Sequence, residues 1–250
     1  ELMELMKQQA LNFNTRVVED DIVECDFDSR PMKVTSASGE VIETHTIIIA
    51  TGARANYLGL DSEEAYKNKG VSACAVCDGA LPAFRDQVIA IVGGGDSAIE
   101  DATYMTKFAS EVVVIHRRDE LRASKIMQER AFENPKIRFL WNTVVTEVIG
   151  DEVIEKLKLE NRETGETSEL EVGGMFVAIG HTPNTGFLRG QVDLEPSGYI
   201  HLPSSWRTAT SAPGVYAAGD CMDDYYRQAV TAAGTGCMAA LEAERWLSHG

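Results

Sequence analysis

The stretch "VIAIVGGGDSAIEDATYMTKFASEVVVI", residues 88–115, decides the fold of this chain. An apolar run (88–92) leads into three glycines (93–95), which are followed by a predicted helix (96–108) and a second apolar run (112–115). Strand, glycine turn, helix and strand in this order form a βαβ unit, whose two strands lie parallel in one sheet. We therefore predict an α/β protein with a parallel sheet at its core.

The segment Gly93–Ala98 (GGGDSA) fits the G-x-G-x-x-A fingerprint of dinucleotide-binding sites. The first glycine permits a tight turn, the second lets the backbone approach a pyrophosphate, and the alanine lets the helix pack closely on its strand. A plain glycine turn would also explain the triplet alone, but its place between a strand and a helix is the context that the fingerprint requires. Because a helix N-terminus favours an anion, the expected cofactor-binding residues are Gly93, Gly94, Gly95, Asp96 and Ser97.

The residues after the second strand indicate which dinucleotide is bound. An NAD site usually has an acidic residue about 20 residues further on, where it holds the ribose 2′-hydroxyl. This chain has His116, Arg117 and Arg118 there, and Arg122 follows. Guanidinium groups bind a 2′-phosphate with charge-assisted hydrogen bonds, whereas a carboxylate would repel it. A solvated basic cluster that balances nearby acidic residues is the alternative, but the position at the strand end favours NADPH.

Cys74 and Cys77 form a C-x-x-C pair that Asp78 follows directly. Zinc would need two more ligands at similar spacing, and the other three cysteines are isolated in the sequence. Two inert thiols remain an alternative. A cycling dithiol exchanges through a mixed disulfide and needs a nearby acid or base as thiolates form and leave. Asp78 favours this redox interpretation, in which a flavin is the usual relay from nicotinamide to disulfide.

Two further glycine turns end predicted buried strands. Thr51-Gly52 follows the strand 46–50, and Gly219-Asp220 follows the strand 214–217. The aspartate suits binding of cofactor hydroxyls, and the N-terminus of the next helix could face an electron-rich ring of the cofactor. An ordinary turn with an N-capping aspartate explains the same residues.

The other elements are predicted as helices at 1–13, 124–132 and 228–247, as a linker at 58–70, and as strands at 16–18, 22–25, 32–35, 41–43, 137–140, 144–148, 154–160, 169–172 and 175–179.

The composition of the chain argues against several classes of protein. The net charge of −16 argues against nucleic acid or an anionic membrane as the main partner. No apolar run reaches the ~18 residues of a spanning helix, and the acidic start lacks the features of a signal peptide. Five cysteines in 250 residues do not suit a secreted disulfide framework. We therefore expect a cytoplasmic protein without a metal site.

Over nearly all of its length the chain resembles the low-molecular-weight thioredoxin reductases. The stretches that carry the resemblance are ACAVCDG (73–79), VGGGDSAIEDATYMTKFASEVVVIHRRDELRA (92–123), FVAIGHTPNT (176–185) and GVYAAGDCMDDYYRQAVTAAGTGCMAALEAERWL (214–247). The order is specific, because few families place a redox C-x-x-C inside the pyridine-nucleotide domain. The resemblance implies an NADPH-dependent oxidoreductase that contains FAD, reduces oxidised thioredoxin and forms a homodimer.

The resemblance also implies roles for individual residues. Cys77 would face the flavin, Cys74 would attack the thioredoxin disulfide, and Asp78 would act as acid and base. Phosphates of NADPH would lie against the glycine turn, and the 2′-phosphate would be surrounded by His116, Arg117, Arg118 and Arg122. The residues implied around the cofactors, most of them around FAD, are Thr51, Gly52, Ile179, Gly180, Gly219, Asp220, Arg227, Gln228 and Ala229.

The implied architecture is two Rossmann-like nucleotide-binding domains, with parallel sheets and an antiparallel meander. Residues 1–54 and 183–250 would form a split FAD-binding domain around an NADPH-binding and redox-disulfide domain at 55–182, and the family rotates one against the other. The family opens with a second glycine fingerprint for FAD that these 250 residues lack, so we expect a partial sequence of an active enzyme. The alternatives are a reductase of another disulfide carrier, such as a peroxiredoxin, and a non-catalytic NADPH-binding redox sensor.

Overall fold

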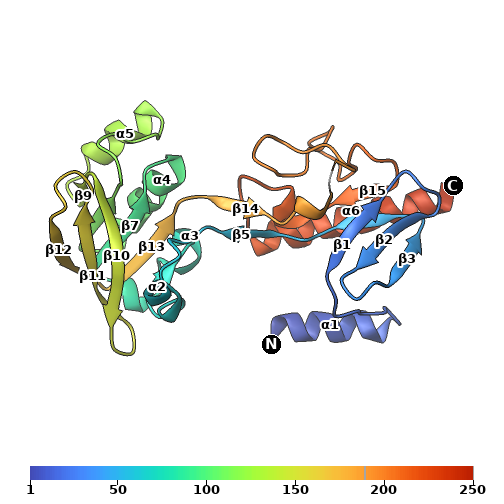
Figure 1. The fold of residues 1–250 in the computed structure, drawn as a ribbon, viewed down its shortest axis with the longest axis horizontal. Coiled ribbons are helices and arrows are strands. Elements are labelled where there is room, and N and C mark those ends of the chain that lie inside the picture. Colours follow the sequence, from blue (N-terminus) through green and yellow to red (C-terminus); the bar gives the residue numbers. More distant parts are fainter. Residues whose placement is uncertain (189, 250) are drawn as a thin grey trace. The chain divides into compact units, whose positions relative to one another are not determined.

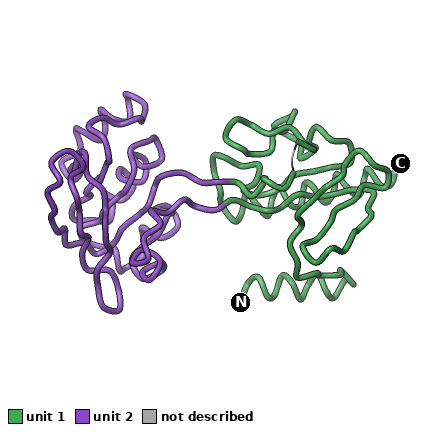
Figure 2. The backbone as a smooth tube through the Cα atoms, viewed as in Figure 1, with its two compact units in different colours: residues 1–53, 183–250 green, residues 54–182 purple. Residues whose placement is uncertain are grey.

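Residues 1–188 and 190–249 are described by a computed structural model, in which the chain forms two units (Figure 2). Unit 2 is continuous and comprises residues 54–182, whereas unit 1 combines residues 1–53 with the chain from residue 183 onward. The chain passes between the units along β5 (Ala53–Ala55) and β14 (His181–Pro183), which pair with each other in a two-stranded sheet (Figure 1).

A five-stranded sheet forms the centre of unit 2 (Figure 1). Every pair of neighbours in it is parallel. In spatial order its strands are β6 (Val71–Ser72), β13 (Gly174–Ala178), β7 (Val88–Gly93), β8 (Glu111–Ile115) and β9 (Ile137–Leu140). Because the strands are parallel, all five carboxyl ends meet at the same edge of the sheet, which is where open α/β sheets bind their ligands.

The two faces of this sheet are covered by different layers. Side chains alternate between the faces of a strand, so Ile89 and Ile91 join one core cluster whereas Ala90 and Val92 join another. The first cluster lies under the helices α4 (Asp96–Met105) and α5 (Lys125–Phe132), and the second lies under an antiparallel meander. The meander strands are β10 (Thr143–Gly150), β11 (Ile154–Asn161) and β12 (Thr167–Glu171).

The segment predicted as a linker contains a short helix, α2 (Asp61–Ala65). Its Glu63 side chain is 1% exposed and accepts hydrogen bonds from the backbone N–H groups of Leu58 and Gly59, at 3.1 and 3.0 Å. A buried carboxylate is tolerated only when such donors compensate it. The segment is therefore polar for two reasons: some of its side chains are exposed, and one carboxylate, that of Glu63, is buried with its hydrogen bonds formed.

Unit 1 contains two small sheets. Strands β1 (Ile22–Asp26), β2 (Met32–Ser36) and β3 (Val41–Thr44) are antiparallel, and β4 (Ile47–Ile49) pairs in parallel with β15 (Val215–Ala217). Short 3₁₀ turns, η2 (Gly186–Leu188) and η3 (Gly219–Cys221), follow in the C-terminal part. The core includes the fully buried side chains of Met32 and Leu188. These contacts join residues from both sequence segments of the unit.

Two helices complete unit 1, α1 (Leu2–Asn12) and α6 (Ala229–His249) (Figure 1). Small residues on α6, Ala239 and Ala243, are buried against Tyr216 in β15 and Ala218 directly after it. Their small size lets the helix lie close to the strand. None of the residues of α1 is buried.

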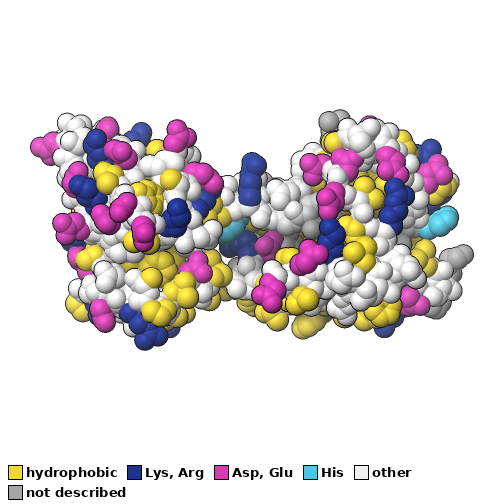
Figure 3. All heavy atoms as spheres, turned by 90° about the horizontal axis from the view of Figure 1, so that it is seen from below, with side chains coloured by type: hydrophobic (Ala, Val, Ile, Leu, Met, Phe, Trp, Pro, Cys, Tyr) yellow, Lys and Arg dark blue, Asp and Glu magenta, His cyan; other side chains and the backbone are white. Residues whose placement is uncertain are grey.

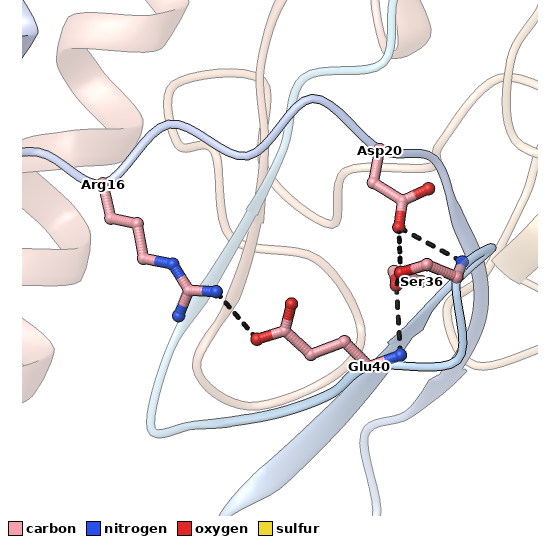
Figure 4. A network of polar contacts seen from close by, with 5 residues as sticks. Arg16, Asp20, Ser36 and Glu40 are labelled. Atoms are coloured by element: carbon pink, nitrogen blue, oxygen red, sulfur yellow. Dashed lines mark hydrogen bonds and ion pairs between the residues drawn. The ribbon is translucent and has the colours of Figure 1, made fainter.

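The predicted strand at 16–18 is wrong, because these residues have no regular structure. Polar contacts hold this stretch instead (Figure 4). The Arg16 guanidinium lies 2.7 Å from Glu40, and the Asp20 carboxylate accepts a 2.6 Å hydrogen bond from the Ser38 hydroxyl. Ser38 in turn contacts the Ser36 hydroxyl. These bonds join the stretch to the β2–β3 turn without a strand ladder.

The surface carries both signs of charge. On the face in Figure 3, acidic and basic side chains are interspersed over both units, without a single large basic patch. No helix in the described part of the chain is long and apolar enough to cross a bilayer.

Candidate functional site

Four of the predicted functional segments follow parallel strands of unit 2. The Cys74–Cys77 segment follows β6, the glycine turn follows β7, residues 116–118 follow β8, and Ile179-Gly180 follows β13. All four therefore lie at the carboxyl edge of one sheet. The chain runs outward from β7 to β8 and β9, but β13 lies on the other side of β7. Such a reversal of strand order opens a crevice for a ligand.

A cavity of about 560 Å³ lies at this reversal. Its polar lining includes backbone and side-chain groups from the segments after β7, β8 and β13. The lining residues that were predicted from the sequence are Gly93, Gly94, Gly95, Asp96, Ser97, His116, Arg117, Arg122, Ile179 and Gly180. Asn56 and Thr143 also line it, and nothing in their local sequence marked them.

The three glycines differ in what surrounds them. A Cβ on Gly93 would lie 2.4 Å from the Ala178 carbonyl oxygen and 2.7 Å from the Ala98 Cβ, and a Cβ on Gly94 would lie 2.3 Å from the His116 ring. A Cβ on Gly95 would meet nothing within 4 Å. The first two glycines therefore allow close packing inside the protein, whereas the third leaves open space before the N-terminus of α4. This geometry fits a dinucleotide pyrophosphate.

The basic side chains fit a 2′-phosphate. Arg117, Arg118 and Arg122 are all exposed, and the first and last of them line the cavity. Arg118 is not among the described lining residues. Exposed guanidinium groups at the rim of a cavity retain free donors for an anion. The structure thus brings two of the three predicted arginines to the cavity.

His116 lies in a different environment from the arginines. Its side chain is 5% exposed, and its Nε2 donates a hydrogen bond to the Glu120 carbonyl oxygen at 2.9 Å. Burial lowers the pKa of the His116 imidazole, with smaller contributions from the charges of Arg118 and Arg122. The ring is therefore neutral near pH 7, and one of its nitrogens is already engaged within the protein.

Cys74 and Cys77 form a disulfide with a Cα–Cα distance of 5.3 Å. Cys77 lies within α3 (Ala75–Asp78) and Cys74 is at its N-cap position, where the Cys74 Sγ accepts the Cys77 N–H at 3.2 Å. Cys77 is exposed and Cys74 is partly exposed. An accessible disulfide can undergo exchange with an external thiol or disulfide.

Ser72 links the acid/base candidate to the redox pair, a role that no local sequence pattern indicates. Its hydroxyl donates to the Asp78 carboxylate at 2.6 Å and accepts the Cys74 N–H at 3.1 Å. A hydroxyl has one hydrogen to donate, so this arrangement directs it to the carboxylate. Ser72 therefore orients Asp78 and the start of α3 together.

The residues predicted around FAD lie in unit 1. Because β4 and β15 are parallel neighbours, Thr51-Gly52 and Gly219-Asp220 lie at the same carboxyl edge. Gly52 and Gly219 have φ angles of +67° and +73°, which favour glycine. This edge fits the position that nucleotide cofactors take at parallel sheets.

The remaining predicted FAD residues precede or begin α6. Arg227 and Gln228 lie just before the helix, and Ala229 is its first residue. The Asp223 carboxylate accepts hydrogen bonds from the backbone N–H groups of Tyr225, Tyr226 and Arg227, at 2.8 to 3.0 Å. Asp223 therefore shapes the turn that leads into α6, a role that its local sequence does not indicate.

The other three cysteines are thiols. Burial, with a smaller contribution from the Glu24 charge, raises the pKa of the Cys25 thiol to about 11. Burial also raises the pKa of the Cys221 thiol. Because the thiolate is the reactive form, these two thiols are unreactive near pH 7. Cys237 is exposed.

A comparison with protein families matches residues 4–236 to the pyridine nucleotide-disulphide oxidoreductases. The match covers both units and most of the chain. It agrees with the arrangement of a nucleotide-type cavity and a disulfide at one sheet edge. The chain belongs to the pyridine nucleotide-disulphide oxidoreductase family.

Within that family, its relatives are thioredoxin reductases. It is 51% identical to the thioredoxin reductase of Eremothecium gossypii over 254 residues, covering all of this chain and 79% of that protein. It is 49% identical to that of Streptomyces coelicolor, covering 99% of this chain and 76% of the other. The solved structure of a thioredoxin reductase from Giardia duodenalis is 41% identical, with a TM-score of 0.93 over 99% of this chain and 80% of that one.

Proposed function

We propose that this chain carries out NADPH-dependent, FAD-mediated reduction of oxidised thioredoxin. The observation that carries the proposal is the accessible Cys74–Cys77 disulfide at the sheet edge where the same unit has its glycine turn and arginines. The names of the related proteins supply the expected acceptor, thioredoxin. In the overall reaction, NADPH and a proton reduce the thioredoxin disulfide to a dithiol, leaving NADP⁺.

The chain's own residues perform the exchange with thioredoxin. In the reduced pair, the Cys74 thiolate attacks one sulfur of the thioredoxin disulfide, forming a mixed disulfide and releasing the other sulfur as a thiolate. Asp78 supplies the proton that this thiolate takes up. The Cys77 thiol then gives up its proton and attacks the Cys74 sulfur, which restores the Cys74–Cys77 disulfide and releases the second thioredoxin sulfur as a thiolate that takes up this proton.

The cofactors have distinct places in this proposal. The glycine turn, Ser97, Arg117 and Arg122 would bind NADPH, with Arg118 beside them. Thr51, Gly52, Gly219, Asp220 and the start of α6 would bind FAD. When bound, FAD supplies the relay that carries an electron pair from the nicotinamide to the Cys74–Cys77 disulfide.

Serine variants of the two cysteines test the proposal. With FAD bound, Cys74→Ser should still allow NADPH to bleach the flavin absorbance but should abolish thioredoxin reduction. Cys77→Ser should also abolish turnover and should trap a mixed disulfide between Cys74 and thioredoxin, because no resolving thiol remains. Normal thioredoxin reduction by both variants would overturn the redox role of the pair.

The acceptor needs its own measurement. NADPH oxidation should depend on oxidised thioredoxin and should stay low when an oxidised peroxiredoxin replaces it. A preference for the peroxiredoxin would identify the alternative disulfide carrier as the substrate. A purified full-length protein that binds NADPH without flavin absorbance would favour a redox sensor.

The predicted homodimer and cytoplasmic location remain predictions. Several large apolar side chains on α6 are exposed, and they support the proposal that this helix meets a second copy: Val230, Met238, Leu241, Trp246 and Leu247. Light scattering of the full-length protein should give twice the chain mass, and a single chain mass at micromolar concentration would contradict the dimer.

A further inference from the structure

The loop after β8, residues 117–124, is attached to the glycine turn by its backbone. The Gly94 carbonyl oxygen accepts two hydrogen bonds, from the N–H groups of Arg122 at 2.7 Å and Ala123 at 3.1 Å. Arg122 is therefore placed relative to the fingerprint by its own backbone. The loop and the glycine turn form one bonded structure although about 25 residues of sequence separate them.

Asp96 adds a side-chain tie between the same two segments. Its Oδ1 accepts a 2.8 Å hydrogen bond from the N–H of Ser124, the residue at the N-cap position of α5. Asp96 lines the cavity, and an unengaged carboxylate there would repel a phosphate. The bond to Ser124 gives this carboxylate a structural partner and holds the end of the loop.

His116 ties the beginning of the loop in the same way. Its ring lies under Gly94, so close that a Cβ on that glycine would be 2.3 Å away. Its Nε2 donates to the Glu120 carbonyl oxygen in the middle of the loop. The imidazole thus packs against the fingerprint on one side and holds the loop on the other.

The loop alternates between anchored and free residues. Leu121 and Ala123 are buried in the core cluster under α4, whereas Arg117, Arg118 and Arg122 are exposed. Hydrogen bonds restrain the loop backbone at Glu120, Ala123 and Ser124. The guanidinium groups of the loop therefore have a restricted range of positions before any ligand binds. A pre-organised donor loses less entropy when it binds its ligand.

We propose that Asp96 and His116 are positioning residues for cofactor specificity, which restrain the 117–124 loop so that its arginines meet a 2′-phosphate. The inference rests on the proposed NADPH function and differs from the sequence-based expectation that both residues bind the cofactor directly. Their hydrogen bonds go to the loop backbone. Their effect should therefore fall on the nucleotide with the 2′-phosphate and spare the nucleotide without it.

Calorimetric binding to the full-length protein tests this with two probes, 2′,5′-ADP, which carries the 2′-phosphate, and 5′-AMP, which lacks it. The wild-type protein should bind 2′,5′-ADP more tightly by roughly tenfold to a hundredfold, as expected for charge-assisted hydrogen bonds. Asp96→Ala and His116→Phe should each reduce this ratio by about tenfold and change 5′-AMP affinity less than about twofold. Phenylalanine keeps a ring under Gly94 but cannot donate.

Conservative variants provide the matched controls. Asp96→Asn keeps an oxygen acceptor for Ser124 and His116→Gln keeps a donor for Glu120, so both should retain most of the binding ratio. Asp151→Ala removes an exposed carboxylate that does not line the cavity, and it should change neither affinity.

The outcomes separate the inference from the function on which it rests. A wild-type protein with no preference for 2′,5′-ADP would overturn the proposed NADPH specificity together with the inference. An unchanged ratio in Asp96→Ala, or an equal loss for both probes, would overturn the positioning role alone. If His116→Phe fails to fold, Asp96→Ala and its asparagine partner still decide the result.

Discussion

Ser72 and Asp78 show how one hydroxyl, through two hydrogen bonds, can couple a carboxylate to a disulfide. The Ser72 hydroxyl touches both the Asp78 carboxylate and the Cys74 backbone N–H. It therefore fixes the carboxylate relative to the segment that carries the reacting sulfur. The serine does not itself need to exchange a proton with thioredoxin.

Substitutions at these two positions should have graded effects on turnover. Asp78→Asn should slow thioredoxin reduction by roughly 10²–10⁴-fold, the range for loss of a general acid or base. Ser72→Ala should slow thioredoxin reduction less, because Asp78 remains but loses the hydroxyl that orients it. Ser72→Thr keeps a hydroxyl and should therefore retain most of the wild-type rate. Steady-state kinetics with thioredoxin would check this, and equal rates for wild type and Asp78→Asn would rule out the acid/base role.

Asp20 should titrate at an unusually low pH. Hydrogen bonds from Ser38 and Ser36 lower its pKa from 3.8 to about 2. Because its pKa is lowered in the folded state, the ionised Asp20 carboxylate stabilises the fold at pH values above 3.8. This stabilisation is lost as the pH falls from 3.8 through about 2. NMR titration of the Asp20 carboxyl carbon should give the low midpoint in the wild type and a higher one in Ser38→Ala. An ordinary midpoint in the wild type would contradict the network in Figure 4.

At the scale of elements, the glycine turn between β7 and α4 combines two separate requirements. Gly93 and Gly94 are closed in by Ala178, Ala98 and the His116 ring, whereas Gly95 faces open space. The fingerprint pattern requires glycine at positions 93 and 95 and leaves position 94 open. The structure separates a packing role from a ligand-binding role.

Alanine variants of adjacent glycines should separate these roles. Gly94→Ala forces its Cβ against the His116 ring and should lower the free energy of unfolding by about 1–3 kcal/mol, the usual range for overpacking. Gly95→Ala should lower stability by only about 1 kcal/mol, because alanine is a poorer N-cap than glycine, yet it should weaken NADPH binding. Denaturant unfolding and calorimetry would measure both. Normal NADPH affinity in Gly95→Ala would place the pyrophosphate elsewhere.

At the scale of the whole molecule, each unit has its own hydrophobic core. Two core clusters lie entirely within residues 54–182, and two others draw only on residues 1–53 and the segment from 183 onward. The first segment of unit 1 therefore depends on the last one for its packing. Unit 2 takes its core from continuous sequence.

Matched leucine substitutions should destabilise one unit at a time. Leu157 in unit 2 and Leu188 in unit 1 are both fully buried. Replacing either by alanine should cost about 2–5 kcal/mol. Hydrogen exchange read by mass spectrometry should rise in unit 2 for Leu157→Ala and in unit 1 for Leu188→Ala. A similar rise in both units for either variant would show that they unfold together.

The sequence by itself determined the βαβ unit, the glycine fingerprint, the basic residues after β8 and the redox pair. These features are local, because a turn, a cap or a C-x-x-C spacing is encoded within a few consecutive residues. The same local reasoning was wrong for residues 16–18, which have no regular structure and in which Arg16 instead forms an ion pair with Glu40. It also missed α2, whose Glu63 is buried by contacts that polarity does not reveal.

Only the tertiary structure decided how these pieces meet. Parallel pairing of β6, β13, β7 and β8 brings the disulfide segment and the cavity to one sheet edge. Chain folding also places the His116 ring under Gly94 and the Ser124 N–H on Asp96. Such contacts join residues that are distant in sequence, and their directions depend on strand order and side-chain packing. No local pattern encodes them, because each becomes fixed only when the whole sheet has formed.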